Sequence, residues 1–153
     1  MIDYLKADAN FSYNHSADTT LTGVSDSWGN PVNNGFTVPN TYAGPMTIVY
    51  FNMQGNHKLK LTGGSHGAGI LLVDGNLEVE GGFTWYGVII VSGELKLTGG
   101  GDKNITGGIL TGEAGNGEVD VGGNTGIIYC SSLRDKLKNI VPASKIARWR
   151  EVF

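Results

Sequence analysis

The chain has 153 residues, of which 25 are glycine, 40% are hydrophobic and only 16% are charged. This length fits one domain, and the composition excludes a membrane protein and a disordered chain. The net charge of −3 is the sum of +4 from residue 134 onward and −7 before it. The basic residues of the last segment alternate with apolar ones and lack an aromatic platform. They therefore indicate a solvated helix face and no nucleic-acid partner.

Residues 1–45 are rich in Asn, Asp, Ser and Thr, with prolines spaced between aromatic residues. Residues 2–9 fit one short helix, with Tyr4 and Leu5 facing inward. Turn-forming residues dominate the rest of the segment. We expect residues 1–45 to form a polar, irregular N-terminal cap that packs onto the remainder of the domain.

An internal repeat is the main signal between residues 46 and 130. Residues 69–81 (GILLVDGNLEVEG) and 87–99 (GVIIVSGELKLTG) match without a gap at an offset of 18 (87 − 69), with apolar, polar and glycine positions matched between the two copies. Residues 59–63 precede residues 77–81 by the same offset. The period predicts one structural unit that recurs along this part of the chain.

Weaker copies follow toward the C-terminus. Gly108 and Gly126 begin apolar runs at the same offset, and residues 118–122 supply an alternating segment between them. The step from Gly87 to Gly108 is longer (108 − 87 = 21), which a loop insertion at residues 99–104 would explain. The repeat therefore spans about 18 to 21 residues per copy.

Each copy divides into three short strands. Residues 70–73 are a continuous apolar run, residues 77–79 alternate, and residues 83–85 supply a third piece before the next glycine. No helix fits between these strands, which excludes a βαβ unit. We expect a single-domain, right-handed parallel β-helix (β-solenoid) over residues 46–130, with glycines at tight corners.

Two inward ladders of stacked side chains follow from this register. The first ladder is Leu59, Leu77 and Leu95, and the second is Leu61, Val79 and Leu97. The competing fold is an antiparallel sandwich or barrel, which also has short strands and frequent turns. That fold does not predict a gapless self-match at a constant offset.

Residues 131–153 contain no glycine. Ser132 and Asp135 are spaced as a helix start, and Leu133 and Leu137 begin a helical apolar pattern that ends before Pro142. The end of a solenoid exposes unpaired strand edges and an open core. We expect a C-terminal capping helix and tail over residues 131–153.

The sequence predicts no catalytic, cofactor-binding or metal site. His15, His57 and His66 lie apart without metal-ligand spacing, and Cys130 lies alone in an apolar run typical of a buried thiol. Residues 112–117 are rich in glycine but lack the lysine of a phosphate-binding loop. The sequence therefore predicts a protein that is not an enzyme and needs no cofactor.

The acidic residues of the repeat fall at outward strand positions or at corners. Paired carboxylates are what a polysaccharide-cleaving β-helix would use. In an alternating strand, however, every second residue is simply the solvent face. Glu78 and Lys96 occupy matching positions in successive copies, so we expect them to form an ion pair between coils.

Aromatic side chains are the candidates for an interaction site. Phe83, Trp85 and Tyr86 share one corner strand, where alternation allows only some of them inside. We expect contact with a partner protein at Trp85 and Tyr86 if the tryptophan is exposed. Inward-facing Phe83 and Trp85 would leave Tyr86 alone and weaken this interpretation.

Residues 69–77 (GILLVDGNL) and 82–93 (GFTWYGVIIVSG) resemble the C-terminal region of bacterial type IV pilus assembly accessory proteins of the PilX kind. The ending at residues 149–152 (WREV) is similar to their closing tryptophan motif. The resemblance covers residues 46–153 and implies a structural or adhesive role at the cell envelope, with other pilus or envelope proteins as partners. It also implies a pilin-like N-terminal membrane helix in the parent protein. This chain lacks such a helix, as a truncated soluble piece would.

Two other classes remain open. Bactofilin-like scaffolds, located in the cytoplasm, are also parallel β-solenoids with coils of similar length, and they polymerise end to end. A polysaccharide-binding or polysaccharide-cleaving β-helix is the third class. Filament formation by the purified protein would favour the scaffold, and release of saccharide would favour the third class.

Overall fold

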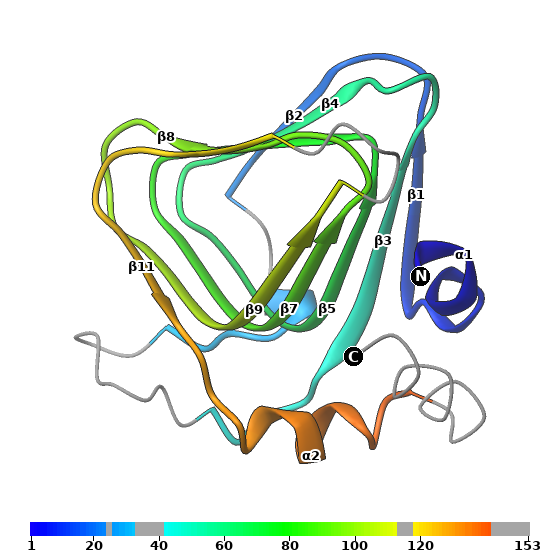
Figure 1. The fold of residues 1–153 in the computed structure, drawn as a ribbon, viewed down its shortest axis with the longest axis vertical. Coiled ribbons are helices and arrows are strands. Elements are labelled where there is room, and N and C mark those ends of the chain that lie inside the picture. Colours follow the sequence, from blue (N-terminus) through cyan, green and yellow to red (C-terminus); the bar gives the residue numbers. More distant parts are fainter. Residues whose placement is uncertain (24–25, 33–41, 113–117, 142–153) are drawn as a thin grey trace.

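The structure is a computed structural model and describes residues 1–23, 26–32, 42–112 and 118–141. Its strands form two parallel sheets stacked as a β-solenoid of about four turns, which confirms the fold class predicted from the repeat. Seen end-on, the coils form a rounded triangle (Figure 1). The motif at residues 149–152, the basic residues after position 142 and most of the glycine-rich segment 112–117 lie outside the described residues.

The strands of successive coils pair in parallel within each sheet. The larger sheet, sheet A, has the order β1 (Phe11–His15), β3 (Thr47–Met53), β5 (Ser65–Asp74), β7 (Phe83–Val91), β9 (Lys103–Thr111) and β11 (Thr125–Ile128). The smaller sheet, sheet B, has the order β10 (Val119–Val121), β8 (Leu95–Thr98), β6 (Asn76–Glu80), β4 (Lys58–Thr62) and β2 (Thr19–Thr22). Each coil therefore contributes to both sheets.

Glycine is required where the long strands of sheet A pass a corner. Gly69, Gly87 and Gly107 have φ angles of 119°, 145° and 142°. A Cβ atom at Gly87 would lie 1.8 Å from the carbonyl oxygen of Gly69, and one at Gly107 would lie 1.8 Å from that of Gly87. Only glycine permits this approach of backbone to backbone.

Both predicted ladders are confirmed. Leu77 is paired in register with Leu59 on one side and with Leu95 on the other, and Val79 is likewise paired with Leu61 and Leu97. All of these side chains are buried. The ladders form the inner face of sheet B and pack against the inward residues of sheet A in one core.

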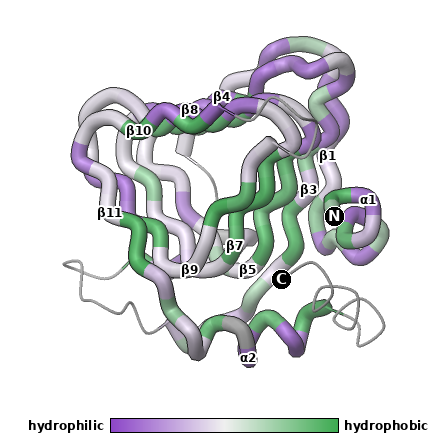
Figure 2. Tube along the Cα trace, in the orientation of Figure 1, coloured by the Kyte–Doolittle hydropathy of each residue, from purple (hydrophilic) through white to green (hydrophobic). Residues whose placement is uncertain are grey.

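A second apolar layer lies outside sheet A. Ile70 and Leu72 point outward from β5, and helices α1 (Ile2–Leu5) and α2 (Leu133–Leu137) cover this face. Figure 2 shows hydrophobic residues along β5, β7 and α2. The prediction of a C-terminal helix is thus confirmed, but the helix packs against the side of the coils. A strand that is apolar on both faces needs such a lateral cover.

The N-terminal segment is less irregular than the sequence predicted. Strands β1 and β2 extend the two sheets by one further coil, through pairing with β3 and β4. Their polar composition hides a period of two, in which Phe11 and Tyr13 are half-buried while Ser12 and Asn14 are exposed. Near the terminus the helix is shorter than expected, ending at Leu5 before a 3-10 turn over Lys6–Asp8.

Two further details differ from the prediction. Tyr4 is exposed, and Ile2 joins Leu5 in the buried layer instead. The structure pairs Gly87 with Gly107 rather than with Gly108, so the offset between these two coils is 20 (107 − 87) and not 21.

The last weak copy is also shifted. Gly126 lies beside Asn104, because β11 pairs with the first half of β9. The alignment of Gly126 with Gly108 is therefore wrong. The offset between β9 and β11 is 22 residues (125 − 103), so a match at an offset of 18 aligns the wrong residues here.

Candidate functional site at the open end of the solenoid

The predicted interaction corner is not on the surface. Phe83, Trp85 and Tyr86 are all buried. The rings of Phe83 and Trp85 stack inside the coil with centroids 6.2 Å apart, and the Trp85 Nε1–H donates to the Gly69 carbonyl oxygen at 3.2 Å. Gly67 leaves room for this ring, since a Cβ atom there would lie 2.1 Å from the indole.

Tyr86 points outward but is covered. The ammonium group of Lys136, from α2, donates to the Tyr86 hydroxyl at 3.1 Å and lies 5.0 Å from the ring centroid. The ring of Tyr42 packs edge-on against it at 5.7 Å. The outer layer that covers sheet A therefore hides the residue that alternation alone would expose, so neither Trp85 nor Tyr86 offers a contact surface.

The histidines lie apart, as the sequence suggested. His57 Nδ1 lies 3.5 Å from a carboxylate oxygen of Asp18, and His66 Nδ1 lies 3.0 Å from the Gly29 carbonyl oxygen. His15 stacks on Phe51, and its Nε2 is buried without a hydrogen-bond partner. Among the described residues, no group of three or more histidine, cysteine or acidic side chains is placed to hold a metal ion.

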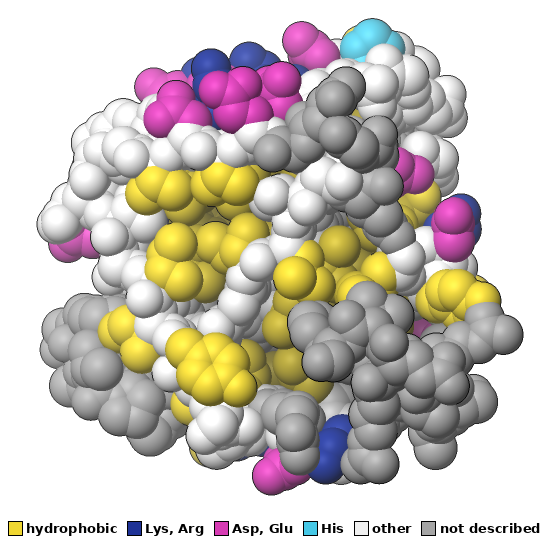
Figure 3. All heavy atoms as spheres, viewed as in Figure 1, with side chains coloured by type: hydrophobic (Ala, Val, Ile, Leu, Met, Phe, Trp, Pro, Cys, Tyr) yellow, Lys and Arg dark blue, Asp and Glu magenta, His cyan; other side chains and the backbone are white. Residues whose placement is uncertain are grey.

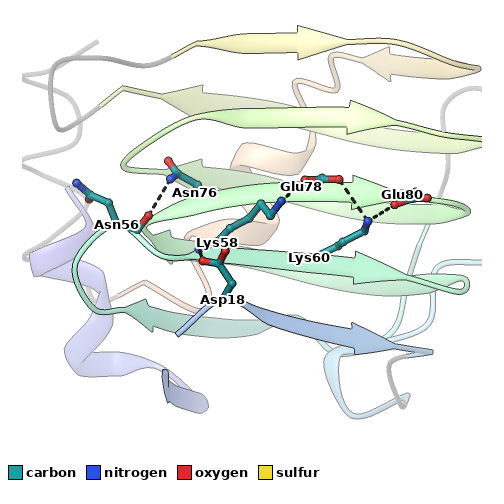
Figure 4. A network of polar contacts seen from close by, with 7 residues as sticks. All are labelled: Asp18, Asn56, Lys58, Lys60, Asn76, Glu78 and Glu80. Carbon is teal, nitrogen blue, oxygen red and sulfur yellow. Dashed lines mark hydrogen bonds and ion pairs between the residues drawn. The ribbon is translucent and has the colours of Figure 1, made fainter. Parts of the chain in front are cut away.

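The outer face of sheet B carries a network of charges (Figure 4). The Glu78 carboxylate forms ion pairs with the ammonium groups of Lys58, at 2.8 Å, and Lys60, at 3.5 Å. Lys60 also forms an ion pair with Glu80. Hydrogen bonding by Lys58, followed by the charges of both lysines, holds the pKa of Glu78 below its ordinary value. The ion-pair partners of Glu78 thus come from the preceding coil. The predicted ion pair with Lys96 is wrong, although Lys96 lies beside Glu78 in the register.

An asparagine reinforces the corner next to this network. The Asn76 side-chain amide donates to the Asn56 carbonyl oxygen at 2.9 Å, and its oxygen accepts from the Glu94 backbone N–H at 2.9 Å. One side chain thereby bridges three coils. These polar groups hold the stack together, and their contacts are structural.

The two ends of the solenoid differ. At the N-terminal end, Trp28 is buried and packs edge-on against Phe51 at 5.6 Å, while its Nε1–H donates to the Tyr13 hydroxyl at 3.4 Å. Tyr13 in turn stacks on Phe51 at 4.7 Å. These three aromatic rings plug the first coil.

The last coil has no such plug in the described chain. We call β10, β11 and Tyr129 the open end. Val119 and Val121 are in register with Leu95 and Leu97 of the inward ladders, yet both are 49% exposed, against 0% for each leucine. Figure 3 looks onto this end and shows hydrophobic side chains gathered below the charged rim of sheet B.

Apolar exposure extends along the second strand of the open end. Ile127 is 47% exposed and Tyr129 is 82% exposed. Strands β10 and β11 are the terminal strands of their sheets, each with one neighbouring strand in the described part of the chain. Sequence reasoning missed this surface. The available signal was that residues 119–121 are the last alternating segment of the repeat in the sequence, with no matching segment after it up to residue 141 to cover their inward side chains.

This arrangement can bind an extended chain. A strand edge offers main-chain donors and acceptors, and the neighbouring apolar side chains offer area to bury. In the described residues, no helix is long and apolar enough to cross a membrane. Comparisons with protein-family models, curated proteins and solved structures found no match to this chain.

Proposed function

We propose that this chain is a non-catalytic structural module of the bacterial cell envelope, associated with type IV pilus assembly, which contacts another pilus or envelope protein through the open end. The observation that carries the proposal is the uncovered last coil. Four of the six large hydrophobic side chains exposed among the described residues lie there, beside two terminal strands. Natural proteins usually cover or blunt such edges unless a partner pairs with them.

The pilus assignment is supported by the resemblance at residues 69–77 and 82–93. An extracytoplasmic location follows from the same resemblance. The solenoid suits a structural role because its core grows lengthwise and each coil holds the next. The contacts between coils, such as the Glu78 pairs with Lys58 and Lys60, give the module a fixed shape.

A non-catalytic role is supported by how the acidic side chains are used. The Glu78 carboxylate is neutralised by two lysines. Asp74 accepts a hydrogen bond from the Ser92 hydroxyl at 3.0 Å, and that hydroxyl accepts from the Gly75 N–H at 2.8 Å. Both carboxylates thus act within the stack of coils.

The proposal is tested by capture of partners from the native envelope. The bait is the purified chain, with Val121→Asp as the variant at the open end. Thr20→Asp is the matched control, because Thr20 is exposed on the terminal strand at the other end of sheet B. We expect wild type and Thr20→Asp to capture the same pilus or envelope protein, and Val121→Asp to lose it.

Three results would contradict this proposal. Identical partner sets for all three proteins would remove the open end as the contact surface. Turnover of a saccharide or an ester by the purified chain would remove the non-catalytic assignment. Filaments formed by the purified chain would replace the pilus role with that of a polymerising scaffold.

A further inference from the structure

We infer that the open end accepts an added parallel β-strand on β10 and that the added strand alternates apolar residues with Lys or Arg. This inference rests on the proposed function, because it takes the open end as the contact surface and names the chemistry of the partner. Three features of β10 carry it: its free backbone groups, its uncovered valines and its place in a column of alternating charge.

Within the described ranges of the chain, the backbone of β10 pairs with β8 on one side and with no strand on the other. On the paired side, Glu118 O accepts from Leu95 N at 2.8 Å and Gly122 N donates to Leu97 O at 2.7 Å. In a parallel strand, the N–H and C=O of one residue point to the same neighbour, and successive residues point to opposite neighbours. The main-chain groups of Val119 and Val121 therefore point away from β8. A further strand would pair with them.

The side chains set the apolar half of the pattern. Val119 continues the ladder of Leu95, and Val121 continues that of Leu97. A further strand aligned with β10 would place two side chains over these valines, as β10 itself covers the two leucines. Apolar residues at those positions would bury the exposed area and complete both ladders.

The charges set the other half of the pattern. On the outer face of sheet B, the register places Lys60, Glu78, Lys96 and Asp120 in one column across four neighbouring strands. Their signs alternate from strand to strand. Opposite charges directly across strands are stabilising and like charges are destabilising. The next residue in the column, beside Asp120, should therefore be Lys or Arg.

A second copy of this chain fits the column poorly. One arrangement stacks strand β2 of another copy on β10. Thr19 belongs to the same ladder as Val119, so in this arrangement Thr19 would cover Val119. Asp18 would then lie beside Glu118, and the uncharged Thr20 beside Asp120. If two open ends met with antiparallel β10 strands centred on Asp120, the two Asp120 carboxylates would face each other. Both arrangements bring acid against acid.

The chain itself supplies the probe peptide. Residues 57–63 (HKLKLTG) contain β4, which pairs in parallel with the acidic strand β6. On β10, this peptide would place its lysines beside Glu118 and Asp120 and its leucines over the two valines. The matched control is the same peptide with both lysines changed to glutamate. Binding of each labelled peptide to the full chain is measured by fluorescence anisotropy at low salt.

We expect the lysine peptide to bind about tenfold more tightly than the glutamate peptide. Asp120→Lys should reduce or reverse this preference. Val121→Pro should weaken binding of the lysine peptide at least tenfold, because it removes an outward N–H while proline is tolerated on a free strand edge. If Val121→Pro lowers the melting temperature, Asp120→Lys carries the test, since Asp120 is exposed.

The inference is overturned by equal binding of both peptides, by binding of neither, or by an unchanged preference in Asp120→Lys. Self-association of the chain that Val121→Pro abolishes would assign the open end to a second copy and also overturn it. If the chain captures no envelope protein but still prefers the lysine peptide, the pilus assignment is rejected and this inference stands. Capture that Val121→Asp abolishes, without discrimination between the peptides, would reject this inference alone.

Discussion

Lys103 occupies, in the coil of β9, the inward position that Phe83 occupies one coil earlier. The lysine is fully buried, and its ammonium group donates to the carbonyl oxygens of Gly99 at 3.2 Å and Gly101 at 3.4 Å. Its aliphatic stem thus fills space that an aromatic ring fills in the preceding coil, while its end holds the corner loop.

Substitutions of Lys103 should separate the contribution of its packed stem from that of its two hydrogen bonds. Lys103→Met keeps much of the stem but leaves two carbonyl groups without their donor, so we expect the free energy of unfolding to fall by about 1–2 kcal/mol. Lys103→Ala also opens a cavity and should cost about 1–2 kcal/mol more. Urea unfolding followed by circular dichroism measures both. An alanine variant as stable as wild type would show that the site is not buried in solution.

Corner glycines should differ sharply in their tolerance of a methyl group. Gly87→Ala places a Cβ atom 1.8 Å from the Gly69 carbonyl oxygen at a φ of 145°, and we expect a loss of at least about 2 kcal/mol. Gly100→Ala is the control, because a Cβ atom there meets nothing within 4 Å. We expect its melting temperature to stay within a few degrees of wild type. Equal effects of the two changes would contradict the corner geometry.

Two neighbouring residues of β8 test the direction of the ladders. Leu95→Asp buries an unpaired carboxylate in the core, which costs several kcal/mol and should abolish the cooperative thermal transition. Lys96→Thr, one residue later on the exposed face, should melt within a few degrees of wild type. The comparison uses differential scanning calorimetry. Cooperative unfolding of Leu95→Asp near the wild-type temperature would place that side chain outside the core.

The repeat was enough to predict which residues stack in the central coils. It did not predict the number of strands, because residues 83–85 and the following apolar run lie in one strand, β7. A gapless match at a constant offset fixes which residues lie side by side, and alternation then decides which of Leu77 and Glu78 faces the core. Both assignments agree with the register and the burial. A constant offset of 18 fails where the coil length changes, because the offset is 20 between β7 and β9 (103 − 83) and 22 between β9 and β11 (125 − 103).

Features that depend on contacts between distant segments could not be predicted in this way. Alternation correctly directs Tyr86 outward, but it cannot show that Lys136, far along the chain, covers the ring. The same limit applies to α2, whose apolar spacing indicates a buried face without naming the surface that buries it. The exposure of Val121 likewise depends on whether a further strand pairs with β10, and the pattern of residues 119–121 cannot show this.

The ion pairs of Glu78 should make stability depend on pH. Its pKa lies below the ordinary value of 4.5 in the folded protein, mainly because Lys58 donates to the carboxylate. The unfolded chain therefore takes up this proton at a higher pH than the folded protein does, and folding stability falls as the pH falls. The contribution is fully present above about pH 5.5 and disappears as the pH drops through the folded-state pKa.

Glu78→Gln removes this titration. We expect the variant to be about 0.5–1 kcal/mol less stable than wild type at pH 7. This difference should shrink as the pH falls through the folded-state pKa, because the wild-type carboxyl then takes up its proton. Urea unfolding at intervals from pH 3 to pH 7 measures the difference. A Glu78→Gln curve parallel to wild type over this range would show that the lysines do not stabilise the folded carboxylate.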